Sequence, residues 1–150
     1  MGYKEVRDAI QSAIDDNLTA VTETSYTVHE RIPETALDAQ GYSIVTLPPN
    51  SSFKMTSTSQ YIDNQNWFID VYSPNVGTSW RSEHEDRLLE YADRIVTIFT
   101  NKRTLIADGI RGVEIVSAQF NNGDFPINSN AMKYHFRLTI RVEYSRARNC

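Results

Sequence analysis

The chain has 150 residues, of which 40% are hydrophobic and 23% are charged, and this length is enough to bury the core of one domain spanning residues 1–150. Its net charge of −4 argues against a general nucleic-acid binder, and its single cysteine, Cys150, excludes an internal disulfide. Because no apolar run reaches the roughly 18 residues of a membrane-spanning helix and the start lacks a signal peptide's apolar core, we expect no membrane contact and a cytoplasmic origin.

The first half of the chain indicates a helix, a long connection and three strands. Apolar residues recur at helical spacing over residues 3–21, which predicts an amphipathic helix. Residues 22–41 are polar and irregular, so we expect a connection there. Strand patterns follow in YSIVTLPPN, which Pro48 and Pro49 are expected to end, and then in SFKMTSTSQY and QNWFIDVYSP. The polar stretch IDNQN suits a short hairpin loop between the last two.

The third of these strands is expected to be covered on both faces. Side chains on a strand point alternately to opposite faces of its sheet. One face of this strand is apolar and predicts core, and it consists of Trp67, Ile69 and Val71. The other face carries two aromatic rings, which favours a covered surface over a solvated one, and it consists of Phe68, Asp70 and Tyr72.

The second half of the chain predicts a helix followed by two strands. Ser82 and Glu85 form a capping-box pattern that marks the helix start, and Asn101 is a plausible stop. The expected buried stripe of this helix is Leu88, Tyr91, Ala92, Ile95 and Phe99. VEIVSAQF predicts a strand, and NNGDFPINSNA predicts a loop. From Met132 to Tyr144 apolar and polar residues alternate without a break, which predicts a long strand that buries Tyr134, Phe136, Leu138, Ile140 and Val142.

These elements together predict an α+β domain. The expected sheet is mostly antiparallel and has about five strands, because runs of strands adjoin their hairpins. Two main helices are expected to pack on one face of this sheet. The expected chain order is helix, three strands, helix, two strands.

Signatures of catalysis are missing from the sequence. His84 and Glu85 would need a second histidine at position 88 to match the zinc-protease motif, and Leu88 stands there. No nucleophile elbow, dinucleotide-binding or phosphate-loop motif occurs. We therefore expect a protein that is not an enzyme and that needs no cofactor or metal. An enzyme with a site assembled from distant residues is the alternative.

Charge is divided unevenly along the chain. Residues 1–93 hold 6 Lys/Arg and 15 Asp/Glu, a net charge of −9, whereas residues 94–150 hold 9 Lys/Arg and 4 Asp/Glu, a net charge of +5. The polar face of the last strand contributes a cationic row, Lys133, Arg137 and Arg141. This row fits three uses: contact with another subunit, contact with phosphates, or a sheet face balanced by acids on a neighbouring strand. Stacking aromatic residues are missing from that face, which disfavours nucleic-acid binding.

The arrangement of elements resembles the tail terminator, or tail-completion, proteins of long-tailed bacteriophages. The resemblance runs through most of the chain, from the first helix YKEVRDAIQSAI and the strand SIVTLPP to WFIDVYSP. It continues through the loop NVGTSWRSEHED, the helix RLLEYADRIVTIF and the closing strand HFRLTIRVEYSR. The order of an aromatic-rich strand running into proline, an acidic helix start and a terminal alternating strand is typical of that family.

The resemblance implies a structural virion protein. Such a protein forms a ring, expected to be hexameric, at the head-proximal end of the tail tube. The ring stops tube polymerisation and joins the tail to the head connector or stopper protein. Its implied partners are further copies of itself, the tail tube protein, the connector, and genomic DNA that passes without sequence-specific recognition. Its implied location is the neck region of the virion tail, and the host cytoplasm during assembly.

Two segments are predicted to contact other subunits or partner proteins. Trp80 lies between polar residues outside any apolar stripe, and tryptophan is enriched at interface hot spots. The first candidate surface is therefore the loop and helix start with Trp80, Arg81, Glu83 and Glu85. The second is the cationic strand face with Lys133, Arg137 and Arg141. The alternative function is a small nucleic-acid-binding α+β domain that uses this strand.

Overall fold

A computed structural model describes most of the chain. The described residues are 2–31, 41–57, 59–74, 81–101, 105, 107–122 and 134–147, without the side chains of residues 81–85, 121, 122, 134 and 147. The elements are α1 (Tyr3–Asn17), β1 (Tyr26–His29), β2 (Tyr42–Met55), β3 (Gln60–Tyr72), α2 (Arg81–Thr100), β4 (Ile110–Asn122) and β5 (Tyr134–Ala147). The predicted α+β class with five strands and two helices is confirmed.

The five strands form one mixed sheet in the order β1-β2-β3-β5-β4. β3 pairs antiparallel with β2 and with β5, and β4 pairs antiparallel with β5. β1 joins β2 in parallel, from Tyr26 opposite Tyr42 to His29 opposite Val45. The prediction of a mostly antiparallel sheet is therefore wrong. It overlooked β1, because four residues within a polar segment are too short to show a recognisable alternation.

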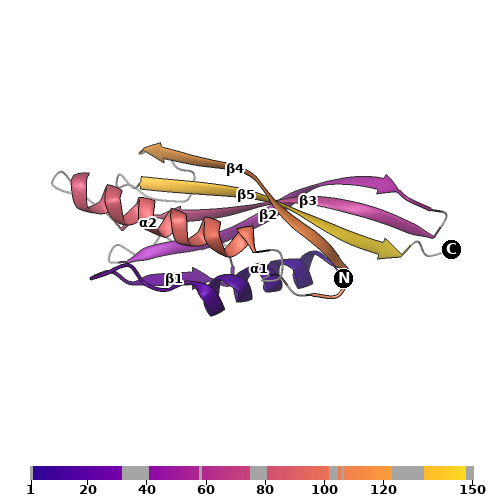
Figure 1. The fold of residues 1–150 in the computed structure, drawn as a ribbon, viewed down its shortest axis with the longest axis horizontal. Helices are drawn as coiled ribbons and strands as arrows, with labels where there is room; N and C mark the ends of the chain where they lie inside the picture. The colour runs from indigo at the N-terminus through magenta and orange to yellow at the C-terminus, as the bar shows by residue number, and fades with distance from the viewer. Residues whose placement is uncertain are drawn as a thin grey trace.

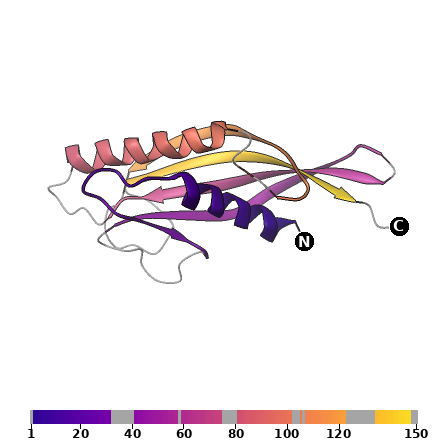
Figure 2. The same ribbon diagram turned by 60° about the horizontal axis from the view of Figure 1, so that its bottom comes forward.

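Both helices lie against the same face of this sheet and share one hydrophobic core with it. In Figure 2, α2 follows β5 and β4, while α1 lies beside β2. The predicted inward face of β5 is buried at Phe136, Leu138, Ile140 and Val142, and Tyr134 lies outside the described side chains. The predicted stripe of α2 is buried as well, and so are Trp67, Ile69 and Val71 of β3.

The strand boundaries around the β2–β3 hairpin differ from the prediction. β2 continues past Pro48 and Pro49, with a shift of register between Leu47 and Asn50. Among the described residues, β1 pairs with β2 only as far as Val45, so the proline positions lie beyond this pairing, and proline is tolerated at such a position. The expected strands 42–50 and 52–61 are thus mostly one strand, and its turn to β3 lies around residues 56–59.

The polar stretch IDNQN lies inside β3 and does not form a loop. Its Asp63 and Gln65 are completely buried on the helix-covered face, where Asp63 Oδ2 accepts hydrogen bonds from Gln65 and Arg146. The helix boundaries also shift slightly. α1 ends at Asn17, although Leu18 and Val21 remain buried beyond it. α2 begins at Arg81, so Ser82 stands within its first turn and not before it.

One end of the sheet extends beyond both helices, as Figure 1 shows. There, residues 50–55 of β2 pair with β3, and β3 in turn pairs with the end of β5. We call this extension the sheet arm. Within the described parts of the chain, neither helix has the length and apolar character that crossing a membrane requires.

Candidate interaction surfaces

A buried polar cluster lies on the sheet face that carries no helix. Asp70 and Arg137 stand opposite each other on β3 and β5. Arg137 donates two hydrogen bonds to the Asp70 carboxylate, from Nε to Oδ1 at 2.8 Å and from Nη2 to Oδ2 at 2.9 Å. The Tyr72 hydroxyl donates to Oδ2 at 3.1 Å, and His135 Nε2 lies 3.1 Å from the same oxygen. The Tyr72 and His135 rings stack with centroids 4.6 Å apart.

The buried carboxylate of this cluster is paired with a positive charge inside the cluster. Burial by itself would raise the pKa of Asp70, but hydrogen bonds from Arg137 and His135 and the charge of Arg137 outweigh it, so that pKa lies below its ordinary value. The hydrogen bond to Asp70 raises the pKa of Arg137. Burial, and then the nearby Asp70 charge, raise the pKa of Tyr72. The cluster therefore holds an ionised carboxylate at neutral pH, fully buried beside its guanidinium partner.

The second arginine of the cationic row is also paired within the chain. Arg141 Nη1 lies 2.8 Å from Oε1 of Glu114, which stands opposite it on β4. Both side chains are well exposed, so this pair contributes little to stability. Arg137 and Arg141 are thus neutralised by acids on neighbouring strands, which matches the third of the uses that the sequence left open.

The other predicted interface residues are only partly described. Trp80 and Lys133 lie outside the described residues. Arg81, Glu83 and Glu85 are in the first turns of α2, and their side chains are outside the description. The described residues therefore do not show how far apart the two predicted surfaces lie. Their role as contacts remains a proposal.

A chain of buried polar contacts joins the core to the sheet arm. Trp67 Nε1 donates to Gln65 Oε1, and Gln65 Nε2 donates to Asp63 Oδ2, both at 2.8 Å. Arg146 Nε donates to the same Asp63 oxygen at 2.7 Å. The Arg146 guanidinium also lies over the Tyr3 ring, 4.8 Å from its centroid. This network links β3, β5 and the start of α1 at the point where the sheet arm begins.

Among the described residues, both edges of the sheet carry strand segments with no further strand beside them. β4 is a terminal strand of the sheet along its whole length. On the other side, β1 covers only residues 42–45 of β2, so the Asn50–Met55 segment is a second edge among the described residues. Open strand edges offer unpaired backbone N–H and C=O groups to another chain.

Exposed apolar side chains gather at these same two edges. Phe120 at the β4 edge is 49% exposed, and Val116 lies in the irregular pairing of that strand and is 45% exposed. At the β2 edge, Phe53 is 57% exposed and Met55 is 55% exposed. We name these surfaces the β4 edge (Val116, Phe120) and the β2 edge (Phe53, Met55).

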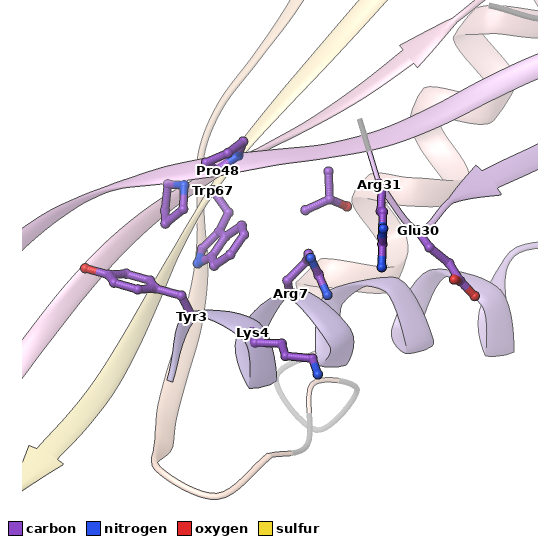
Figure 3. A pocket seen from close by; sticks show the side chains of 9 residues that line it. Tyr3, Lys4, Arg7, Glu30, Arg31, Pro48 and Trp67 are labelled. Carbon is purple, nitrogen blue, oxygen red and sulfur yellow. The ribbon is translucent and has the colours of Figure 1, made fainter. Parts of the chain in front are cut away.

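A hollow of about 610 Å³ opens between α1, β2 and β3, as Figure 3 shows. Its walls combine apolar and cationic side chains. Tyr3, Pro48 and Trp67 lie on one side, and Arg7 and Arg31 lie on the other. We call this hollow the α1 groove, and its full lining is Tyr3, Lys4, Arg7, Glu30, Arg31, Thr46, Pro48, Pro49 and Trp67.

Most of these features leave little trace in the sequence. Asp70 carried a usable signal, since a lone acid between aromatic and branched residues of a strand predicts a buried, paired carboxylate. The α1 groove carried no such signal, because its residues come from four separate segments. The β2 edge could not be predicted, because the pattern of the sequence predicts that Pro48 and Pro49 end the strand.

Among the residues whose positions are described, no three His, Cys, Asp or Glu side chains lie close enough together to hold a metal ion. Comparison of the chain with models of known protein families gives no match. Comparison with curated proteins likewise gives no match.

Proposed function

We propose that this chain is a structural, ring-forming protein that ends the tail tube of a long-tailed bacteriophage and joins it to the head. The observation that carries this proposal is the pair of open sheet edges. They lie on opposite sides of one sheet, and each presents exposed apolar side chains. The resemblance of the element order to tail terminator proteins supplies the biological setting.

The two edges differ from each other, which favours a ring. A contact between two different surfaces repeats head to tail, and it closes into a ring when the rotation per subunit is right. Pairing the β4 edge of one copy with the β2 edge of the next would satisfy backbone groups on both strands. It would also bring Val116 and Phe120 near Phe53 and Met55, so that apolar surface is buried along with the new backbone hydrogen bonds.

The alternative of a nucleic-acid-binding domain is less well supported. That function relied on the cationic row of β5, but Arg137 and Arg141 already have acidic partners within the chain. Binding phosphates through these side chains would require breaking the pair of Arg137 with the buried Asp70. In the ring, therefore, we assign these two arginines to holding the sheet together and not to guiding DNA.

Deletion of the coding sequence from the phage genome that carries it tests the biological role. If the protein ends the tube, the deletion gives separate heads and tail tubes of irregular length in electron micrographs. Complementation with the intact chain restores tails of one length joined to heads. Normal tails on the deletion phage would overturn the proposal.

A charge substitution at the β4 edge tests the contact that carries the proposal. The double variant Val116→Lys and Phe120→Lys should remain folded, since both side chains are half-exposed, but it should no longer assemble. The matched control places two lysines at exposed threonines outside all strands, Thr22→Lys and Thr100→Lys, and it should assemble normally. Assembly by the β4-edge variant at the control's level would exclude this edge from the contact.

A further inference from the structure

We propose that the α1 groove binds an acidic, extended peptide segment of a partner protein. This inference goes beyond ring formation, because the groove is distinct from the β4 edge and the β2 edge. It rests on the charge of the groove, on its length, and on a buried hydroxyl in its wall that has no partner among the described residues.

The groove has an excess of positive charge. Lys4, Arg7 and Arg31 line it, against one acid, Glu30. Arg7 is paired with Asp8 at 3.2 Å. Within the described part of the chain, Lys4 and Arg31 form no salt bridge, and both are exposed. In a chain of net charge −4, two unpaired cations at one hollow favour an anionic ligand.

Thr46 supplies an independent sign of a ligand. Its side chain lines the groove and is only 7% exposed, yet its Oγ1 has no hydrogen-bond partner among the residues that the structure describes. A buried hydroxyl without a partner destabilises the folded chain, and native proteins contain few of them. Oγ1 itself has almost no exposed surface in the free chain, so the Thr46 side chain would turn about χ1 to meet a polar group of a bound peptide and complete this hydrogen bond. Trp67 gives its own N–H to Gln65, so its ring can offer only apolar contact.

The shape of the groove favours a peptide over a small anion. A second hollow of about 400 Å³ continues it along α1, and the two share Lys4, Arg7, Glu30 and Arg31. Together they follow α1 from Tyr3 to Asp15, which at about 1.5 Å per helical residue is roughly 18 Å. An extended peptide advances about 3.3 Å per residue, so five or six residues fill this length. Acids Asp8 and Asp15 border only the second hollow, so the ligand's negative charge belongs at the Tyr3 end.

An array of six-residue peptides provides the test. Each sequence with two glutamates and apolar residues is printed beside matched versions carrying glutamine or lysine in place of glutamate. The labelled full chain is applied at about 0.15 M salt. Glutamate peptides should bind at least about tenfold more tightly than their glutamine counterparts. If no glutamate peptide binds at about 1 mM, or if glutamine peptides bind equally well, the proposal is wrong.

Variants then locate the binding. Lys4→Glu with Arg31→Glu should weaken binding of the best peptide about tenfold or more, whereas Lys54→Glu, an exposed cation on the sheet arm, should change it less than about twofold. Thr46→Val should weaken binding about threefold or more without lowering the melting temperature, because it removes a hydroxyl that has no partner in the free chain. Equal losses for the Lys54 variant would contradict the assigned site.

A single-stranded DNA of twelve nucleotides serves as the competing probe. It should bind the groove more weakly than the best acidic peptide at the same salt concentration. If DNA binds more tightly and the Lys4 and Arg31 double variant abolishes that binding, the groove is a nucleic-acid site and the peptide proposal fails. Ring formation is measured separately by sedimentation, so loss of one proposal leaves the other open to its own test.

Discussion

Asp70 determines whether the cationic face of β5 carries a free charge at Arg137. Its carboxylate is fully buried and takes hydrogen bonds from Arg137 and Tyr72, with His135 at 3.1 Å. A buried carboxylate is tolerated only when partners replace the water it has lost. Arg137 is therefore part of the fold, and its charge is already compensated. The row of cations that the sequence presents as a surface is, at this position, an internal ion pair.

Asp70→Asn should destabilise the chain by about 1.5–3 kcal/mol at pH 7, because it weakens hydrogen bonds to a charged group. The folded-state pKa of Asp70 lies below its ordinary value of about 4. The contribution of the ionised Asp70 to the free energy of unfolding is therefore fully present above about pH 4. It is lost as the pH falls through the lower folded-state pKa. Urea unfolding at neutral and acid pH should show the difference between wild type and variant shrinking in acid.

Glu114→Gln is the matched control for that experiment. It removes the acid from the exposed pair with Arg141, and the expected loss is below about 1 kcal/mol. A similar loss for the two variants at neutral pH would mean that the burial of Asp70 does not strengthen its ion pair.

Phe136 tests which face of β5 belongs to the core. Its ring is fully buried between the sheet and the helices. It packs against the ring of Phe120, with the two ring centroids 4.8 Å apart. Phe136→Ala should cost about 3–5 kcal/mol of unfolding free energy in urea titrations. Phe53→Ala on the exposed arm should cost less than about 1 kcal/mol. A small loss at Phe136 would contradict the assignment of the two faces.

The elements differ in how much of them the sequence could reveal. α1, α2 and β5 show long, regular apolar spacing, and each lies close to where the spacing predicts it. β3 was recognisable only in its apolar half, because Asp63 and Gln65 look like loop residues until their partners on β5 and β3 are known. β1 depends on its parallel pairing with β2, and such contacts between separate segments leave no local pattern.

The turn that leads into β4 depends on one glycine. Gly109 has a φ of +92°, and a Cβ atom there would come within 2.8 Å of the Tyr144 ring. Gly109→Ala should therefore destabilise the chain by about 1–2 kcal/mol through backbone strain alone, and the crowding adds to this. Gly112 has open space around its Cβ position. Gly112→Ala should leave the melting temperature unchanged or slightly higher, and a loss equal to that of the Gly109 variant would contradict the expectation.

Taken together, the described elements form one twisted sheet with two different open edges, as Figure 1 shows. Helices cover one face of the sheet, and the Asp70 cluster lies on the other. The arm network of Asp63, Gln65 and Arg146 keeps the β2 edge aligned with the core. A sheet of this kind suits assembly by edge contact, and the angle between neighbouring subunits then decides whether a ring closes.

Native mass spectrometry of the purified full chain at increasing concentration measures ring closure most directly. A closed hexamer predicts one dominant species at six times the 17.2 kDa chain mass, with no larger series as concentration rises. The Val116→Lys and Phe120→Lys variant should remain at the mass of one chain under the same conditions. A wild-type chain that stays monomeric at every concentration, or that forms an open-ended ladder of oligomers, would contradict the proposed closed ring.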